Sequence, residues 1–356
     1  MQSRTLVTLI LLSYRQEKFI REAVEGALMQ TYSPLEIIFS DDCSPDRTFE
    51  IMQEIVDSYQ GPHTIVLHRN PINLGLCGNL NGAIALSTGE LIVTAGGDDI
   101  CYPDRCQVLA DAWMASSRQW HSICSNANLI DENGKSLGIY NSNKSIRECN
   151  EIRPAIRDGV VGVSGCSHAF SRINYEIFGP LPSSAPGEDE ILGFRSLLLG
   201  GIRWIPAALL SYRKHPAGLY KDQAALRKMG KKARSAAIRE DEFACTLRHE
   251  LYTRYLKIAA DKGVISQEIA AEYSAILTHR FPYHQFTITC KNSVFHATWR
   301  LILIIVSGKY RSGMLAHFKH TYIKFGPRSF VRGVFRDRKA HQFNTVSAIE
   351  KEASDL

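Results

Sequence analysis

The first hundred residues alternate short apolar runs with segments in which apolar residues recur every three or four positions. The apolar runs predict strands over residues 5–14, 35–42, 63–70 and 90–99. The recurring segments predict helices over residues 17–30, 48–59, 77–89 and 102–115. Gly89 is expected to cap the third of these helices. Strands that alternate with helices in this way form βα units around a mainly parallel sheet. The pattern therefore predicts an α/β fold with helices flanking the sheet.

Beyond residue 120 the predicted strands become shorter. A Glu-Asn-Gly turn predicts a hairpin within residues 129–140. A helix is expected over residues 188–199 and a strand over residues 201–215. From about residue 220 the pattern is that of long helices. We therefore expect an α/β domain over residues 1–220 and a helical C-terminal region over residues 221–356.

Composition indicates a folded chain without a membrane span. The residues are 45% apolar and 22% charged, which excludes wholesale disorder. The apolar runs fall short of the roughly 20 residues that cross a bilayer, and the N-terminal run lacks a small-residue cleavage site. The nine cysteines form no CxxC pair, so neither a zinc cage nor a disulfide framework is expected. These observations predict a cytoplasmic protein.

The net charge of +6 is concentrated near the end of the chain. Residues 291–340 contain 11 Lys and Arg and one acid, Asp337, which gives +10, so the remaining residues sum to 6 − 10 = −4. The basic segment also contains the aromatic residues Trp299, Tyr310, Phe318, Tyr322, Phe325, Phe330 and Phe335. This mixture is typical of an interfacial helix on an anionic membrane, and equally of an amphipathic helix packed on the rest of the protein. We favour peripheral attachment to the inner face of a membrane. The chain has no RNP, KH or zinc motif, so nucleic acid is not an expected partner.

Two of the predicted strands end in adjacent aspartates. Asp41 and Asp42 follow the second strand, and Asp98 and Asp99 follow the fourth. In open α/β sheets, ligands bind outside the carboxyl ends of the strands. Taken alone, the turn from Asp41 to Asp46 also fits an ordinary β-turn and helix cap.

The pair at residues 98 and 99 needs compensation for its like charges. Gly96 and Gly97 precede it and leave room for another group to approach the backbone. A set of oxygen ligands suits Mn²⁺ or Mg²⁺, which usually bind together with substrate phosphates. The sequence has no P-loop and no GxGxxG after its first strand, which disfavours Walker-type NTPases and dinucleotide enzymes. A metal-bound nucleoside diphosphate is therefore expected.

A third acidic cluster, Glu188, Asp189 and Glu190, begins the helix predicted over residues 188–199. Acids are favoured at a helix start by the helix dipole, which is one explanation of the cluster. A carboxylate beside a metal-bound donor also serves as a general base toward an acceptor hydroxyl.

These segments together resemble family 2 glycosyltransferases of the GT-A fold. The resemblance covers residues 5–218 and is carried by "SDDCSPDRT", "NPINLGLCGNLNGA", "TAGGDD" and "GED", in the family's order and spacing. It implies a nucleotide-sugar site made by Ser13, Tyr14, Glu17, Asp42, Asn73, Gly75, Asn81, Asp98, Arg213 and His215. It further implies that Tyr14 stacks on a pyrimidine, with Asp98 and Asp99 at the metal and Asp189 as the catalytic base.

Two positions depart from the family's pattern. Gly96 occupies the place of the first acid in the metal motif, which puts metal affinity in doubt. Leu80 stands where many members carry Arg or Lys one residue before Asn81. Neutralisation of the phosphates is then expected to fall to Arg213 or His215.

The resemblance implies a metal-dependent, inverting transfer of a sugar from a nucleoside diphosphate sugar to a hydroxyl of a glycan or a lipid-linked glycan, and the expected donor is UDP-linked. Two alternatives stay open. One is a catalytically silent glycan-binding or scaffold protein of the same fold. The other is a sugar nucleotidyltransferase, although "LLSYRQEK" lacks the glycine-rich basic loop that this class would need after its first strand.

Overall fold

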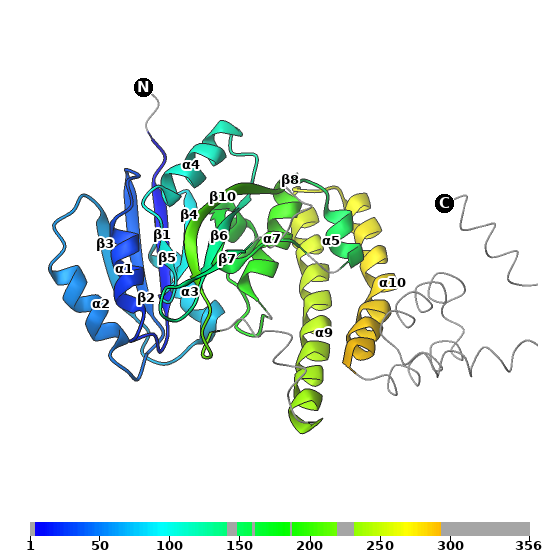
Figure 1. The fold of residues 1–356 in the computed structure, drawn as a ribbon. Coiled ribbons are helices and arrows are strands. Elements are labelled where there is room, and N and C mark those ends of the chain that lie inside the picture. Colours follow the sequence, from blue (N-terminus) through cyan, green and yellow to red (C-terminus); the bar gives the residue numbers. More distant parts are fainter. Residues whose placement is uncertain (1–3, 141–147, 159–160, 186, 219–230, 293–356) are drawn as a thin grey trace, which may run out of the picture. The chain divides into compact units, whose positions relative to one another are not determined.

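The computed structural model describes residues 4–140, 148–158, 161–185, 187–218 and 231–292. Within these residues, ten strands form one sheet (Figure 1). The strands are β1 (Val7–Ser13), β2 (Leu35–Asp41), β3 (Thr64–Arg69), β4 (Leu91–Gly96), β5 (Ile100–Cys101), β6 (Ser122–Ile130), β7 (Ser136–Tyr140), β8 (Glu148–Cys149), β9 (Ala169–Ser171) and β10 (Ile202–Arg213). Their order is β3-β2-β1-β4-β9-β6-β10-β5, with β7 on β6 and β8 on β10.

The first part of the sheet is parallel and the second part is mixed. Strands β3, β2, β1 and β4 are parallel neighbours, as the alternation of strands and helices predicts. Strand β9 then pairs antiparallel with both β4 and β6, while β6 and β10 are parallel. The predicted hairpin is confirmed by the antiparallel pairing of β6 with β7. The α/β fold is therefore confirmed, with parallel strands at the end of the sheet that carries the first Asp-Asp pair.

Nine α-helices are found in the described part of the chain, together with one 3₁₀ turn, η1 (Gly165–Ser167). The helices are α1 (Ile20–Leu28), α2 (Thr48–Asp57), α3 (Gly75–Leu86), α4 (Arg105–Ala115), α5 (Ile152–Asp158), α6 (Ile173–Phe178), α7 (Glu188–Leu199), α9 (Lys231–Asp261) and α10 (Gln267–Asn292).

The cap predicted at Gly89 is wrong, because α3 ends at Leu86 with Ser87 as its cap. Gly89 instead lies against β1, where its N–H donates to Thr8 Oγ1 at 2.9 Å.

Side chains on the two faces of β1 belong to two different hydrophobic cores. Leu9 and Leu11 point into a core shared with α1 and α4. Ile10 and Leu12 point into a core shared with α3, α7 and the later part of α9. All seven residues of β1 are buried, which explains its continuous apolar run. Helices thus cover both faces of the strand that separates the two acid pairs.

Contacts divide the chain into two units. The first contains residues 1–226 and 247–278, and the second contains residues 227–246 and 279–356. Residues 247–278 therefore pack with the sheet, while the predicted boundary near residue 220 stays a prediction. The aromatic residues expected in a basic interfacial helix, from Trp299 onward, lie outside the described residues. Among the residues that the structure describes, no helix has the length and apolarity of a membrane span.

Helix α7 is held by three side chains of α9, all within the first unit. The rings of Phe194 and Tyr252 stack with centroids 3.6 Å apart and planes inclined by 5°. Arg248 Nη2 donates to Glu190 Oε2 at 2.9 Å. Tyr255 is the third contact, and its hydroxyl accepts a hydrogen bond from Arg195 of α7 at 2.8 Å. The later part of α9 and helix α7 therefore belong to the same hydrophobic core.

Candidate functional site

The two Asp-Asp pairs meet at one edge of the sheet, on either side of β1. In the register of the sheet Ser13 lies beside Asp41, and Leu12 lies beside Gly96. Beyond the strand ends the ladder continues, because the N–H groups of Asp42 and Gly97 donate to the carbonyls of Ser13 and Leu12 at 2.9 and 2.8 Å. The predicted meeting of the acid pairs at the carboxyl edge of the sheet is therefore confirmed.

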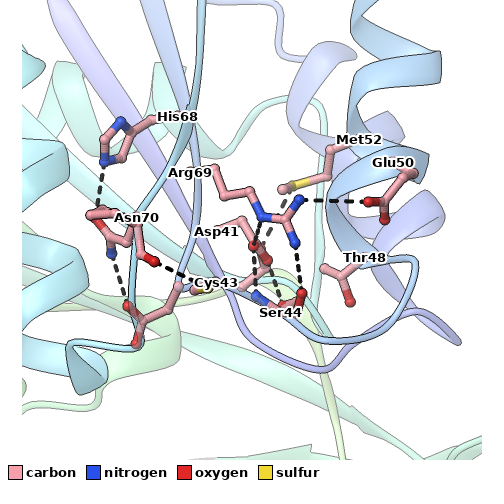
Figure 2. A network of polar contacts seen from close by, with 12 residues as sticks. Asp41, Cys43, Ser44, Thr48, Glu50, Met52, His68, Arg69 and Asn70 are labelled. Atoms are coloured by element: carbon pink, nitrogen blue, oxygen red, sulfur yellow. Dashed lines mark hydrogen bonds and ion pairs between the residues drawn. The ribbon is translucent and has the colours of Figure 1, made fainter.

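Asp41 shapes the turn after β2. It is fully buried, and it accepts hydrogen bonds from the N–H and the hydroxyl of Ser44 at 2.8 and 2.5 Å. Ser13 Oγ donates to it at 3.3 Å, and Arg69 Nε lies 3.6 Å from its other oxygen (Figure 2). Protein groups therefore surround both carboxylate oxygens of Asp41, which gives this acid a structural role.

Asp42 fastens the turn to the loop before α3. Its Oδ1 accepts from Asn70 Nδ2 and from the N–H of Leu74, both at 2.8 Å. Asn73 Nδ2 approaches the carbonyl of Asp42 at 3.4 Å. Asn73 and Gly75 are exposed, and Gly75 has a φ of +73°. Asp42, Asn73 and Gly75, which the resemblance assigns to one nucleotide pocket, are therefore brought together.

Several polar residues behind this pocket were not predicted from the sequence. Asn79 Oδ1 accepts from Ser40 Oγ at 2.6 Å and from Asn70 Nδ2 at 3.0 Å. Asn70 Oδ1 in turn bonds His68 Nε2 at 3.0 Å (Figure 2). Arg69 Nη2 donates to the carbonyl of Ser44 at 2.8 Å. His68 and Arg69 end β3 and Asn70 follows it, so the carboxyl end of the third predicted strand was the signal that pointed to them.

The three residues predicted after the first strand lie at the same edge but have different surroundings. Ser13 is buried under the turn that Asp41 holds. Tyr14 is 38% exposed, and the guanidinium of Arg15 lies 5.1 Å from its ring centre. Glu17 is exposed and accepts from the N–H of Arg47, at the start of α2, at 3.2 Å. Of the three, Tyr14 presents the ring surface that base stacking requires.

Asn81 and Leu80 make their contacts with other parts of the fold. The Asn81 amide exchanges two hydrogen bonds with the backbone of Leu181, at 2.8 and 2.9 Å. Leu80 is fully buried in the core shared by α3 and α7. A cation at position 80 would be inserted into that core, which explains why this chain carries leucine there.

The second acid pair folds back over its own glycines. A Cβ added to Gly96 would lie 2.7 Å from Asp98 Oδ1 and 3.2 Å from Asp99 Oδ2. A Cβ added to Gly97 would lie 2.3 Å from Gln16 Oε1. The close approach predicted at both glycines is confirmed. The space that a side chain at position 96 would enter is thus already occupied by the carboxylates of Asp98 and Asp99.

Arg213 and His215 bind to this pair directly. Arg213 donates from its main-chain N–H to Asp99 Oδ1 and from Nε to the Asp98 carbonyl, both at 3.0 Å. Its guanidinium also pairs with Glu22, and its side chain is only 2% exposed. His215 Nε2 lies 2.9 Å from Asp98 Oδ2. A phosphate would have to displace protein acceptors to reach Arg213, so the geometry favours a supporting role for this residue.

Full ionisation of the second acid pair would require a compensating positive charge, such as a divalent cation. Burial, and then the charge of Asp98, raises the pKa of Asp99 well above its usual range. The side chain of Asp98 remains 19% exposed. Within the described ranges no group of three or more His, Cys, Asp or Glu side chains is arranged to hold a metal. The protein therefore offers two carboxylates, and phosphate oxygens and water would have to complete the coordination.

The third acidic cluster begins α7 next to the turn η1. Asp189 accepts from the N–H of Gly165 at 2.9 Å and from the N–H of Glu190 at 2.7 Å. A Cβ added to Gly165 would lie 2.5 Å from Glu188 Oε1. Burial raises the pKa of Asp189, while burial and the neighbouring charge of Asp189 raise the pKa of Glu188 to about 7. Glu190 is paired with Arg248, so Glu188 and Asp189 are the acids available for proton transfer.

Glu188→Gln is expected to stabilise the protein above pH 7. Because the folded-state pKa of Glu188 is about 7 and the ordinary value is 4.5, the folded chain holds more protons between these values and its stability falls as the pH rises. Glutamine removes this penalty, which amounts to about 3 kcal/mol at pH 8. The gain is expected to vanish near pH 4. Thermal unfolding at both pH values measures it.

Glu190→Gln is the matched control, since it makes the same change two residues away. Glutamine at 190 removes the carboxylate from the ion pair with Arg248, so this variant is expected to lose stability at pH 8. A Glu188→Gln variant that is no more stable than the wild type at pH 8 would contradict the assignment of an ionisation penalty to Glu188.

Comparisons with known proteins identify the N-terminal part of the chain. Residues 8–159 match the family model described as glycosyl transferase family 2. A putative glycosyltransferase EpsE from Bacillus subtilis is 30% identical over 134 residues, covering 38% of this chain and 47% of that protein. A putative colanic acid biosynthesis glycosyl transferase WcaA from Escherichia coli is 32% identical over 108 residues, covering 30% and 38%. An uncharacterized protein from Mycobacterium bovis is 33% identical over 216 residues, covering 60% of each chain.

Solved structures show a more distant similarity. S. aureus TarS 1-349 in complex with UDP-GlcNAc aligns with a TM-score of 0.49 at 13% identity, covering 80% of this chain and 83% of that one. The mannosyltransferase PcManGT from Pyrobaculum calidifontis, in complex with GDP-Man and Mn²⁺, aligns with a TM-score of 0.46 at 17% identity, covering 87% and 82%. This chain spans 38% to 60% of the lengths of the three curated relatives. The match of residues 8–159 to the glycosyl transferase family 2 model agrees with the resemblance that the motifs predicted.

Proposed function

We propose that this chain is an inverting glycosyltransferase that moves a sugar from a nucleoside diphosphate donor, UDP-linked, to a hydroxyl of a glycan or lipid-linked glycan. One observation carries the proposal. The turn at Gly165 is bonded on one side to Thr94 of β4, through Thr94 Oγ1 at 3.2 Å, and on the other side to Asp189 at 2.9 Å. The strand that leads to Asp98 and Asp99 is thereby connected to the carboxylate expected to act on the acceptor.

The residues divide between donor and acceptor. Asp42 and the loop around Asn73 would hold the nucleoside, with Tyr14 offering its ring to the base. Asp98 and Asp99 would hold Mn²⁺ or Mg²⁺, which supplies Lewis acidity toward the leaving diphosphate oxygen. His215 would orient Asp98 through their hydrogen bond.

Asp189 would take the proton of the acceptor hydroxyl. Its two oxygens are fixed by the N–H groups of Gly165 and Glu190, which orients the carboxylate. The acceptor oxygen forms a bond to the anomeric carbon as the bond from that carbon to the diphosphate breaks. Because attack comes from the face opposite the leaving group, the anomeric configuration inverts.

Incubation with a panel of UDP- and GDP-linked sugars, with Mn²⁺ or with EDTA, tests the proposal. We expect a UDP-sugar to raise the melting temperature when Mn²⁺ is present, since a ligand that binds only the folded state stabilises it. We also expect release of the nucleoside diphosphate and a product whose anomeric proton coupling shows inversion.

The other outcomes separate the alternatives. Binding without turnover under any acceptor would favour the silent glycan-binding or scaffold protein. Pyrophosphate release would favour the nucleotidyltransferase. A folded sample whose melting temperature ignores every nucleotide sugar, with and without Mn²⁺, would refute the proposed function. Attachment of the basic segment to an anionic membrane stays a prediction of the sequence.

A further inference from the structure

Arg105 is a fully buried cation at the start of α4. Its exposed fraction is 0%, and it is one of the largest side chains in the interior. Within the described part of the chain, no carboxylate lies within ion-pair distance of its guanidinium, and its Nε has no hydrogen-bond partner. Burying a charge without an ionic partner is costly unless neutral acceptors satisfy it. Its position therefore requires an explanation beyond packing.

The guanidinium joins two separate segments of backbone. Nη2 donates to the carbonyl of Thr94, in β4, at 2.7 Å, and to the carbonyl of Cys166, in η1, at 3.0 Å. Nη1 lies 3.0 Å from Cys101 Sγ. One nitrogen of Arg105 thus bridges a strand and a turn that are far apart in sequence.

Each end of this bridge leads to an acid of the site. Two residues after Thr94, β4 reaches Gly96, over which the Asp98 and Asp99 carboxylates fold. On the other side, Gly165, next to Cys166, donates its N–H to Asp189 at 2.9 Å. Thr94 Oγ1 also donates to the carbonyls of Gly165 and His168, at 3.2 and 3.1 Å. The acceptor-side carboxylate is therefore held to the donor-side strand through Arg105 and Thr94.

We propose that Arg105 is a positioning residue for sugar transfer: by fastening η1 to β4 it fixes the place of Asp189 relative to Asp98 and Asp99. The proposal rests on the proposed function, because Asp189 must act on an acceptor. The planar fork of arginine reaches Thr94, Cys166 and Cys101 at the same time. Lysine at this position keeps the positive charge but has no such fork. Arg105→Lys therefore tests the hydrogen bonds that join β4 to η1 while the charge stays the same.

The test compares Arg105→Lys with Arg195→Lys. Arg195 is also 0% exposed, also has an unpartnered Nε, and also donates to backbone carbonyls, those of Gly179 and Pro180, and to one side chain, Tyr255. Arg105→Lys is expected to lower kcat by about 10- to 100-fold, the size of effect that follows a misplaced catalytic group. KM for the donor is expected to stay within about threefold. Arg195→Lys is expected to lower the melting temperature about as much as Arg105→Lys does. Unlike Arg105→Lys, it is expected to keep kcat within about threefold.

A double-mutant cycle shows whether Arg105 acts through Asp189. In an Asp189→Asn background the further effect of Arg105→Lys on kcat is expected to fall to about threefold or less, since residues that act as a unit are not additive. Equal fold-losses in both backgrounds, or equal losses for Arg105→Lys and Arg195→Lys, would overturn the proposal. If Arg105→Lys does not fold, Thr94→Val is a second variant. It removes the hydrogen bonds from the Thr94 hydroxyl to the η1 region and leaves the Arg105 side chain unchanged.

Amide hydrogen exchange decides the proposal independently of turnover. Arg105→Lys is expected to speed exchange at the Gly165 N–H and in the segment after β4 by about tenfold, while Arg195→Lys leaves both unchanged. Unchanged exchange at Gly165 in Arg105→Lys would overturn the positioning role. A wild-type protein that turns over no nucleotide sugar would instead refute the proposed function, and the exchange result would still show whether Arg105 holds η1 against β4.

Discussion

Asp189→Asn is expected to lower kcat by about 10²- to 10⁴-fold, the range attributed to a positioned general base. The reason is that an amide cannot take the acceptor's proton. Donor affinity is expected to stay within about threefold of the wild type, because the role proposed for Asp189 is toward the acceptor. Single-turnover rates and calorimetric titration of the donor with Mn²⁺ measure the two quantities.

The asparagine variant has a structural cost that needs a control. Both oxygens of Asp189 accept backbone N–H groups, from Gly165 and Glu190, and the NH₂ group of asparagine has to face one of these donors. Asp189→Ala removes this conflict and is expected to be equally inactive. Glu190→Gln, in the same first turn, is expected to keep kcat within about tenfold. An Asp189→Ala variant with kcat near that of the wild type would move the base to Glu188.

Asp98→Asn is expected to lower kcat by about 10²-fold and to raise the Mn²⁺ concentration needed for half-maximal activity, because one of two carboxylates loses its charge. The side chain is partly exposed, so the substitution does not leave an unpaired charge in the core. Activity measured across a series of Mn²⁺ concentrations, at a saturating donor concentration, gives both values.

Asp104→Asn is the matched control for Asp98→Asn. Asp104 is an exposed acid at the start of α4, so removing its charge changes the net charge equally without changing the acid pair. Its dependence on Mn²⁺ is expected to equal that of the wild type. If Asp98→Asn shows the wild-type dependence as well, Asp98 does not hold the cation.

Strand ends were the part of the site that the sequence predicted well. The apolar runs located β1, β2 and β4, and parallel pairing then had to bring Asp42 and Asp98 to the same edge. The motif spacing likewise placed Asp189 at the start of a helix. These features depend on local periodicity and on one general property of α/β sheets.

Contacts between distant segments could not be predicted from local sequence patterns. The bond from Gly165 to Asp189 depends on how η1 packs against β4, and nothing in the local pattern around residue 165 indicates it. The contacts of Arg213 could not be predicted either. The sequence indicated a phosphate ligand, whereas in the structure Arg213 donates hydrogen bonds to Asp98 and Asp99 and pairs with Glu22. Spacing identifies which residues are near the site, whereas their partners follow from tertiary packing.

The two departures from the family's pattern also have physical explanations that only coordinates provide. At Gly96 a side chain would collide with the carboxylates of Asp98 and Asp99. At position 80 the side chain points into the core, where leucine is the natural choice.

The stacking of Phe194 on Tyr252 bears on how this protein is made by the ribosome. Chains emerge from the N-terminus, so α7 leaves the exit tunnel before the part of α9 that covers it. Until Tyr252 and Tyr255 have been synthesised, the helix that carries Asp189 exposes an aromatic ring and Arg195, which is buried in the folded chain, to solvent or to chaperones. The helix that begins with the third acidic cluster thus packs against α9 only late in translation, well after strands β1 to β4 have been completed.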